Sequence, residues 1–374
     1  MSKHTVLKNI IALSLIAPLP VLADTPNVNV YGVANVSYDS INTGTSAAGV
    51  QGTTLSKASS NASRIGLKGS EDLGDGLAAN WQIESLIALD NAGGTFATRN
   101  SFAGLSSKNY GSVLVGRYDT PYKISTRKLD NFSDSIGDNR SLFGTVASTS
   151  ASTAFDGRQP DVIAYSSPLM AGFSAAIAQV NLAETATTNA AAKATATSFA
   201  AMYDSPTLTA SVAYETHMLD TIRVGGTEAA YRAGLGYTLD DFSVAAAYEK
   251  TSDTLGKATS LTTCSALATG ADCFGHSASY LTAKYNFGSD AIKVAYTKVG
   301  ALASAVNTGA DQASLGYDHR LSKRSTVFAV YTKLTNETKA NYGLGNAAFS
   351  SAAFTSIGAG AAPSAFSLGI KQVF

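Results

Sequence analysis

One stretch of the chain, from Asp119 to Gly157, carries charged side chains of both signs but no strand pattern. Its acids are spaced four residues apart, at Asp130, Asp134 and Asp138. Basic residues in the same stretch are Lys123, Arg127, Lys128 and Arg140. Opposite charges that face each other across water orient that water and act on passing ions, whereas charges in direct contact only neutralise each other. Because irregular segments longer than about 15 residues are usually functional or disordered, this stretch is the first candidate for a functional site.

The elements around this stretch show alternation with a period of two. In the hairpin Ser63–Leu89 the second arm places Leu77, Trp81 and Ile83 at odd positions, while Gln82 and Glu84 occupy even ones. Such alternation gives a strand one apolar and one polar face. The arms are joined by Asp-Leu-Gly-Asp-Gly, which supplies the residues of a tight turn. The apolar face could meet a second sheet in a soluble sandwich, or lipid in a membrane barrel.

The same pattern recurs along the chain and predicts sixteen strands. Their ranges are 28–39, the two arms of 63–89, 95–105, 112–118, 158–166, 172–180, 197–203, 208–215, 231–238, 242–249, 277–287, 292–299, 311–319, 325–335 and 366–374. The connections alternate between short and long, so all long loops lie at one end, and the segment from Ser40 to Ala62 is expected to be one of them. An even strand number, sorted loops and aromatics near strand ends favour an all-β, antiparallel transmembrane barrel over a soluble fold. Pairing of the first strand with the last would close it without an edge.

Strand alternation then places charges on the polar face, which lines the lumen of such a barrel. The predicted lining residues are Arg64, Lys68, Glu84, Arg99, Arg117, Arg158 and Arg232. Arg117 shares its face with two valines, so alternation leaves its side open. By strand count the Asp119–Gly157 segment is the third long loop. We expect a basic wall to face the loop aspartates across the narrowest section, which would set ion selectivity; the alternative is that these charges solvate the lumen or bind each other.

The N-terminus reads as a secretory signal peptide, with Lys3 and Lys8, a short apolar core and small residues before Asp24. We expect residues 1–23 to be removed and residues 24–374 to form the barrel domain. The chain has 27 Lys and Arg against 27 Asp and Glu, so its charge balance does not indicate a nucleic-acid partner. Charged residues make up 14% of the chain, with 33 Gly, 17 Tyr and 15 Phe, a composition that suits many short strands with one apolar face.

The two cysteines, Cys264 and Cys273, are close together in a polar segment. In an exported protein this spacing favours a disulfide that closes a small loop. Metal binding is less favoured, since the nearest histidine, His276, stands alone. No triad or paired-acid signature is present, so we expect neither an enzyme nor a cofactor.

Several segments resemble the general porins of Gram-negative bacteria, in particular the neisserial and betaproteobacterial type. They are spread over the chain: Val30-Tyr31-Gly32, the hairpin Ser63 to Leu77, Val115-Gly116-Arg117, Tyr165-Ser166-Ser167-Pro168 with Gly172-Phe173, Leu321-Ser322-Lys323-Arg324-Ser325, and the terminal Phe374. The hairpin and the Leu-Ser-Lys-Arg turn are the specific matches. A Pro-Glu-Phe-Gly segment, common at the tip of the inward loop in porins, is absent.

The resemblance implies a sixteen-stranded barrel with short periplasmic turns, long extracellular loops and a third loop folded inward. It implies a homotrimer in the outer membrane that contacts membrane lipid and lipopolysaccharide. It also implies that Phe374 is read by the barrel-assembly machinery. The expected function is passive diffusion of small hydrophilic solutes and ions; the alternatives are a substrate-specific channel and a barrel that binds or adheres through its outer loops.

Overall fold

A computed structural model describes residues 28–90, 96–144, 155–182, 194–220, 222–344 and 358–374. These residues form one antiparallel sheet of seventeen strand segments. The segments are β1 (Val28–Asn42), β2 (Thr54–Ser60), β3 (Arg64–Gly74), β4 (Leu77–Leu86), β5 (Ser101–Ser107), β6 (Gly111–Asp119), β7 (Arg158–Ser166), β8 (Phe173–Asn181), β9 (Ala194–Asp204), β10 (Leu208–Leu219), β11 (Thr227–Leu239), β12 (Phe242–Asp253), β13 (Ser277–Phe287), β14 (Asp290–Val299), β15 (Ala310–Arg320), β16 (Ser325–Asn336) and β17 (Ser364–Val373). The predicted signal peptide lies outside the described residues.

β2 and β3 are two pieces of a single barrel strand, so the barrel has sixteen strands. β2 pairs with the second half of β1, and β3 pairs with its first half. Between the pieces, Ala62 has a φ of 52° and interrupts the ladder. The prediction of a polar loop from Ser40 to Ala62 is therefore wrong in part. Thr54–Ser60 has few apolar residues, so alternation does not mark it as a strand. Its pairing with β1 brings together segments on either side of a loop, which a local pattern does not reveal.

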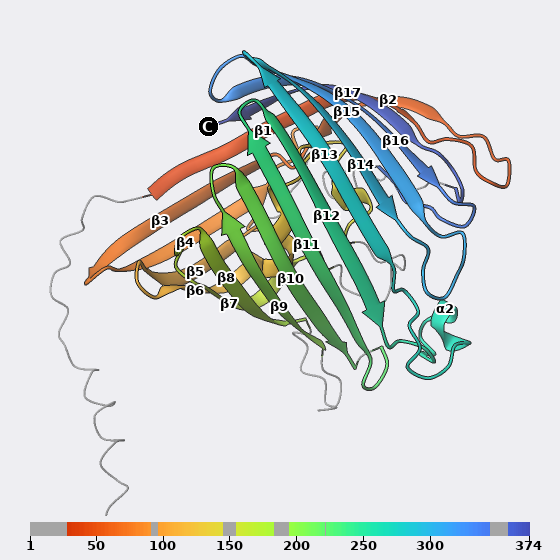
Figure 1. Cartoon of the computed structure of the whole chain (residues 1–374), viewed down its shortest axis with the longest axis horizontal. Coiled ribbons are helices and arrows are strands. Elements are labelled where there is room, and N and C mark those ends of the chain that lie inside the picture. Colours follow the sequence, from red (N-terminus) through yellow and green to blue (C-terminus); the bar gives the residue numbers. More distant parts are fainter. Residues whose placement is uncertain (1–27, 91–95, 145–154, 183–193, 221, 345–357) are drawn as a thin grey trace, which may run out of the picture.

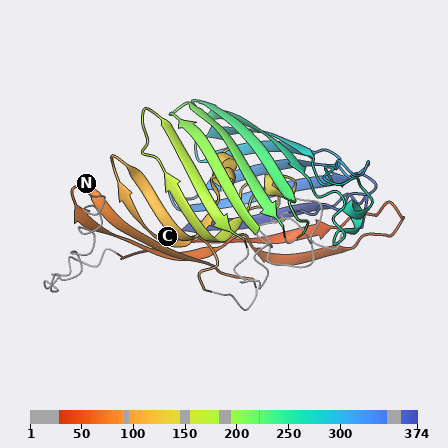
Figure 2. The same ribbon diagram turned by 90° about the horizontal axis from the view of Figure 1, so that it is seen from below.

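The sheet closes because β1 also pairs with β17, from Val33 opposite Val373 to Asn42 opposite Ser364. Figure 1 shows the strands as an inclined wall, with short turns at the end where the C-terminus lies and the longer connections, including α2 (Thr262–Ser265), at the other. Figure 2 shows the same barrel from below, with helical segments inside it. At the seam, the ring of Phe374 covers Gly32, where a Cβ would lie 2.4 Å from it. The predicted closed, sixteen-stranded barrel is confirmed.

The outer surface is an apolar band between two aromatic belts. Leu235 lies in the band and is 55% exposed. The belt at the turn end contains Phe173, Tyr237, Phe242, Tyr285, Phe287, Tyr317 and Phe374, and the belt at the loop end contains Phe199, Tyr231, Tyr248, Tyr296, Tyr331 and Phe366. An apolar band between aromatic girdles is the surface that a membrane-spanning barrel presents to lipid and to the two interfaces. Among the described residues, no helix is long and apolar enough to span a membrane.

The loop between β6 and β7 enters the barrel instead of extending from its end (Figure 2). It begins with α1 (Pro121–Arg127), where Thr120 caps the helix and Pro121 occupies its first turn, both favourable choices at a helix start. A 3-10 turn, η1 (Asn139–Ser141), follows. The predicted strand 95–105 is shorter than expected: β5 starts at Ser101, and Phe96–Asn100 belong to the preceding loop.

Candidate functional site

The third loop lies against the inner wall and crosses the lumen. Its first limb is tied to β9, because the Tyr122 amide donates to Ser198 Oγ over 2.9 Å. Its middle is tied to β13 by Asn131 Nδ2 and Thr282 Oγ1, 3.0 Å apart. Its tip reaches β1, where Asn35 Nδ2 donates to the Asp134 carbonyl over 3.0 Å. The passage that remains is bounded by the loop on one side and by β3–β7 on the other.

Two arginines and one glutamate gather on that opposite wall. Glu84 accepts from Arg99 Nε in a very short contact, and Arg64 Nε lies 4.0 Å from its other carboxylate oxygen. Tyr31 also donates to Glu84 over 3.0 Å. Arg64 Nη1 reaches the loop itself, 3.2 Å from Asp134 Oδ2. On the wall itself, two guanidiniums around one carboxylate leave one positive charge in excess, and Asp134 of the loop tip offsets it.

A second charged group lies beside it at the start of the loop. Asp119 Oδ2 is 2.9 Å from Arg158 Nη2, and Asp119 Oδ1 is 2.8 Å from Lys123 Nζ. Burial lowers the pKa of Lys123 from its ordinary value of 10.5 to about 8, although Asp119 acts in the opposite direction. Arg117 donates to the Thr98 carbonyl over 3.0 Å. The ladder of β6 is irregular between Gly116 and Tyr118, which is why alternation could not place Arg117.

The three loop aspartates do not share one role. Only Asp134 faces the basic wall. Asp138 is buried and receives both ends of the Arg127 guanidinium, at 3.2 and 3.1 Å. Asp130 accepts from Tyr280 of β13 over 2.8 Å, and burial together with the neighbouring Asp138 raises its pKa to about 7. Asp130 and Asp138 therefore hold the loop together and to the far wall; they do not face Arg64 across the passage as the sequence analysis expected.

Arg232 is also placed differently from the expectation. It points inward, as alternation predicts, but it is only 3% exposed because the third loop covers it. Its Nη1 lies 2.7 Å from Asp156 Oδ1 of the loop, and its Nη2 lies 2.5 Å from Glu249 Oε2 of β12. Its guanidinium carbon is 4.3 Å from the centre of the Tyr122 ring. Arg232 is thus an inner-wall residue under the loop, closed off from the open passage.

A basic group on the turn side of the loop was missed by the sequence reasoning. Lys284 and Lys293 stand opposite each other on β13 and β14, and Asp318 lies 3.0 Å from Lys293 Nζ. Lys293, Asp318 and Lys371 of β17 line one hollow with the loop tip. Within the described chain, Lys68, Lys284 and Lys371 form no ion pair within 4.0 Å. Lys68 was among the predicted lining residues. Strand alternation also puts Lys284, Lys293 and Lys371 on the inner face, so the signal for this group was available.

The disulfide between Cys264 and Cys273 is present. It lies in the loop between β12 and β13, in a small apolar cluster with Leu255 and Phe274. Asp253 supports this loop by accepting from the Leu255, Cys273 and Phe274 amides at 2.8, 3.0 and 2.6 Å. Among the described residues, no group of His, Cys, Asp and Glu has the arrangement of a metal site.

A family model described as Gram-negative porin matches residues 10–339 of the chain. The major outer membrane protein P.IB of Neisseria gonorrhoeae is 32% identical over 174 residues, which is 46% of this chain and 47% of that protein. The P.IA protein of Neisseria meningitidis serogroup B is 34% identical over 122 residues, or 32% of this chain and 29% of that protein. The chain thus matches less than half the length of these curated relatives.

Solved structures extend the likeness to the whole barrel. The anion-selective porin from Comamonas acidovorans superposes with a TM-score of 0.78 at 24% identity, covering 94% of this chain and all of that one. OmpT of Vibrio cholerae superposes with a TM-score of 0.64 at 14% identity, covering 94% of this chain and 99% of that one. At these identities the likeness supports the fold.

Proposed function

The chain belongs to the Gram-negative porin family, and from this membership we propose that it forms a water-filled channel for passive diffusion of small hydrophilic solutes, with a preference for anions. It is an outer-membrane β-barrel, so the short turns face the periplasm and the long loops face outward. The observation that carries the proposal is the third loop, which folds into a closed barrel and leaves a passage lined by Arg64, Arg99 and Arg158. Porins are channels, so membership of this family also agrees with the expectation that the chain is not an enzyme.

The preference for anions is supported by the charges along the passage. The carboxylates of Glu84, Asp119, Asp134 and Asp318 are each within 4.0 Å of a cation. Lys68, Lys284 and Lys371 carry charge with no described carboxylate partner. Since rings of fixed charge select ions of opposite sign, the excess of cations favours anions. The structure with the highest TM-score given above is described as anion-selective, which is consistent with this proposal.

The proposed constriction consists of two sets of residues. Those that face the passage are Arg64, Lys68, Glu84, Arg99, Arg117, Arg158 and Asp134. Those that hold the loop in place are Asp130, Asp138 and Arg232, whose side chains are buried. Substitution in the first set is expected to change ion preference, and substitution in the second set is expected to change how the loop is held.

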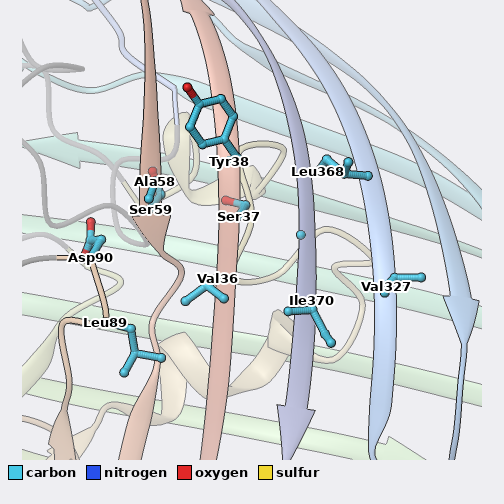
Figure 3. Close-up of a pocket in the computed structure, with 11 residues that line it drawn as sticks. Val36, Ser37, Tyr38, Ala58, Ser59, Leu89, Asp90, Val327, Leu368 and Ile370 are labelled. Carbon is cyan, nitrogen blue, oxygen red and sulfur yellow. The ribbon is translucent and has the colours of Figure 1, made fainter.

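We also propose that the chain assembles as a homotrimer through the wall around β1. Near the periplasmic end, the outer face of β1, β3 and β6 presents exposed aliphatic side chains, at Val28, Val30, Ile65, Leu73, Val113 and Val115, whereas most of the aromatic belt lies on β8–β17. Figure 3 shows a hollow on this wall, lined by Val36 of β1, Leu368 and Ile370 of β17 and Leu89 of the second loop. Tyr38 and Asp90 also line this hollow. An indented wall with exposed aliphatic side chains and few aromatics suits contact with a second copy better than contact with the lipid interface. Mass measurement of the detergent-solubilised protein tests this.

Contact with lipopolysaccharide is proposed at the outward lysines near the loop end. Lys250, Lys298 and Lys333 stand at corresponding positions of β12, β14 and β16 and are exposed on the outer face. Lysines there can bind lipid phosphates. We also propose that residues 1–23 are removed on export and that the assembly machinery recognises Phe374. Mass spectrometry of the mature protein tests the first proposal, and deletion of Phe374 tests the second.

Planar-bilayer recording tests the main proposal. In asymmetric KCl the reversal potential is expected to have the sign of anion selectivity, and conductance is expected to rise linearly with salt. In liposomes, uptake of a graded sugar series should fall smoothly with size and show little saturation. Saturable uptake of one sugar would indicate a substrate-specific channel. If correctly folded protein does not conduct at all, the result would favour a barrel that binds or adheres through its outer loops.

A further inference from the structure

Both limbs of the third loop meet at a single point on the inner wall of β10–β12. From the first limb, Tyr122 is fully buried, and its hydroxyl donates to Glu249 Oε2 over 2.7 Å. From the returning limb, Asp156 binds Arg232 Nη1 at 2.7 Å. Arg232 also binds Glu249 through Nε at 3.0 Å. One guanidinium therefore joins the wall to both limbs.

The returning limb has a second support beside this point. The Phe155 ring stacks on His217 of β10, with ring centres 4.7 Å apart. Each ring nitrogen of His217 faces a buried carboxylate: Nδ1 lies 2.6 Å from Glu228 Oε1, and Nε2 lies 2.9 Å from Glu215 Oε1. A neutral imidazole has only one N–H. Two hydrogen bonds from His217 therefore require one further proton on the trio of His217, Glu215 and Glu228. The trio fixes the surface on which Phe155 rests.

Within the returning limb, Gly144 and Asp156 also approach each other closely here. The Gly144 amide donates to Glu249 Oε1 over 2.9 Å, with Gly144 at a φ of 65°. A Cβ on Gly144 would lie 2.3 Å from Asp156 Cβ. Arg140 adds a second cation to Asp156 in a very short contact. The approach is so close that Gly144 cannot move without disturbing the contacts of Asp156.

We propose that Arg232, Asp156, Glu249 and Tyr122 form a clasp that closes the third loop into a ring and sets how far its tip stands from Arg64. This inference rests on the proposed channel function. Arg232 is then a positioning residue: it acts on the passage through the loop and does not meet the solute. Removing one partner of a buried ion pair strongly destabilises the packed arrangement, because the charge that remains is buried without a partner or water. The clasp therefore has two states, closed or released, and few intermediate positions.

The test compares two loop–wall ion pairs that differ in burial. Asp156→Asn removes the loop carboxylate of the clasp. The matched control, Asp204→Asn, removes the carboxylate that binds Lys128 at 2.5 Å, a pair with side chains 49% and 32% exposed. Each variant removes one negative charge from a loop–wall ion pair, so the change in net charge is the same in both variants. Tyr122→Phe, which loses only the hydroxyl bound to Glu249, provides a milder change within the clasp.

Loop position is measured by electron-spin distances between labels at Ser133→Cys on the loop and Asp75→Cys on a periplasmic turn. The wild type and Asp204→Asn are expected to give one narrow distribution. Asp156→Asn should raise the population of the released loop by about a hundredfold, as the loss of one buried charge partner implies, and so give a second, broad distribution. Its single-channel current should show added noise and frequent sublevels. Tyr122→Phe should broaden the distances less.

The outcomes separate the two proposals. If wild-type protein does not conduct, the channel function fails while the distances still report on the clasp. If the wild type conducts and Asp156→Asn gives the same distances and current noise as Asp204→Asn, the clasp is refuted. If Asp156→Asn does not fold, a narrow distribution and unchanged noise in Tyr122→Phe would refute it as well.

Discussion

Arg64 of β3 and Asp134 of the third loop form an ion pair between the barrel wall and the loop tip, with Nη1 and Oδ2 3.2 Å apart although the residues are 70 positions apart in the chain. Both side chains are partly exposed, at 21% and 23%. This pair joins the basic wall to the loop tip.

Removing the positive member of this pair should weaken the preference for anions. Arg64→Gln deletes one cation from the passage, and the reversal potential in a KCl gradient is expected to shift toward the value for a cation-selective channel. Asp134→Asn should shift it the opposite way. Lys108→Gln, which removes an exposed charge in a periplasmic turn, is the control and should leave the potential unchanged. Equal shifts in Arg64→Gln and Lys108→Gln would contradict the assignment of Arg64.

Selectivity should also depend on pH through Lys123. Its pKa is lowered to about 8, chiefly by burial, so raising the pH from 7 to 9 neutralises it and should reduce the preference for anions. Between about pH 8 and the ordinary pKa of 10.5, Lys123 is neutral in the folded protein but still protonated in the unfolded chain. The free energy of unfolding therefore rises with pH in that range. Reversal potentials at the two pH values measure the first effect. Lys123→Met should abolish the step, and its persistence would assign the titration elsewhere.

A charge on the lipid-facing surface should destabilise the barrel according to depth. Leu235→Lys places an ammonium in the apolar band and is expected to cost about 2–4 kcal/mol, whereas Tyr237→Lys, nearer the periplasmic interface, should cost about 0–1 kcal/mol. Urea unfolding of the protein refolded into lipid vesicles measures both. Equal costs at the two positions would show that Leu235 does not face the hydrocarbon.

The disulfide should stabilise one outer loop and leave the channel unaffected. The bridge spans nine positions, from Cys264 to Cys273, and closing so short a loop contributes roughly 2–3 kcal/mol. Replacing both cysteines with serine should speed amide exchange in residues 254–276, while conductance and reversal potential remain as in the wild type. A change in conductance would mean that this loop reaches the passage.

Gly144→Ala should disturb the loop without removing any charge. The residue has a φ of 65°, and a Cβ there would lie 2.3 Å from that of Asp156. The two parts of the returning limb must separate to admit it, so the current is expected to become noisier. Gly225→Ala is the control: its φ is 68°, and no atom lies within 4 Å of the added carbon. If both variants behave alike, backbone strain and not the close approach explains the effect.

Local alternation was enough to predict the barrel. Along β11, Tyr231, Leu235 and Tyr237 face outward while Arg232 and Gly234 face inward, because successive side chains of a strand point to opposite faces. Alternation failed where the ladder is irregular, at Arg117, and where a strand has few apolar residues, at Thr54–Ser60. The disulfide followed from two close cysteines in an exported chain.

By itself, therefore, the amino-acid sequence determined which face of each strand meets lipid, how many strands close the barrel and which loop is long enough to enter it. Only the tertiary structure decided which charges meet. Asp130, Asp134 and Asp138 look equivalent along the chain, yet two are buried against Arg127 and one faces Arg64. The physical reason is that alternation is a property of a single strand, whereas an ion pair depends on the distance between segments that the fold brings together.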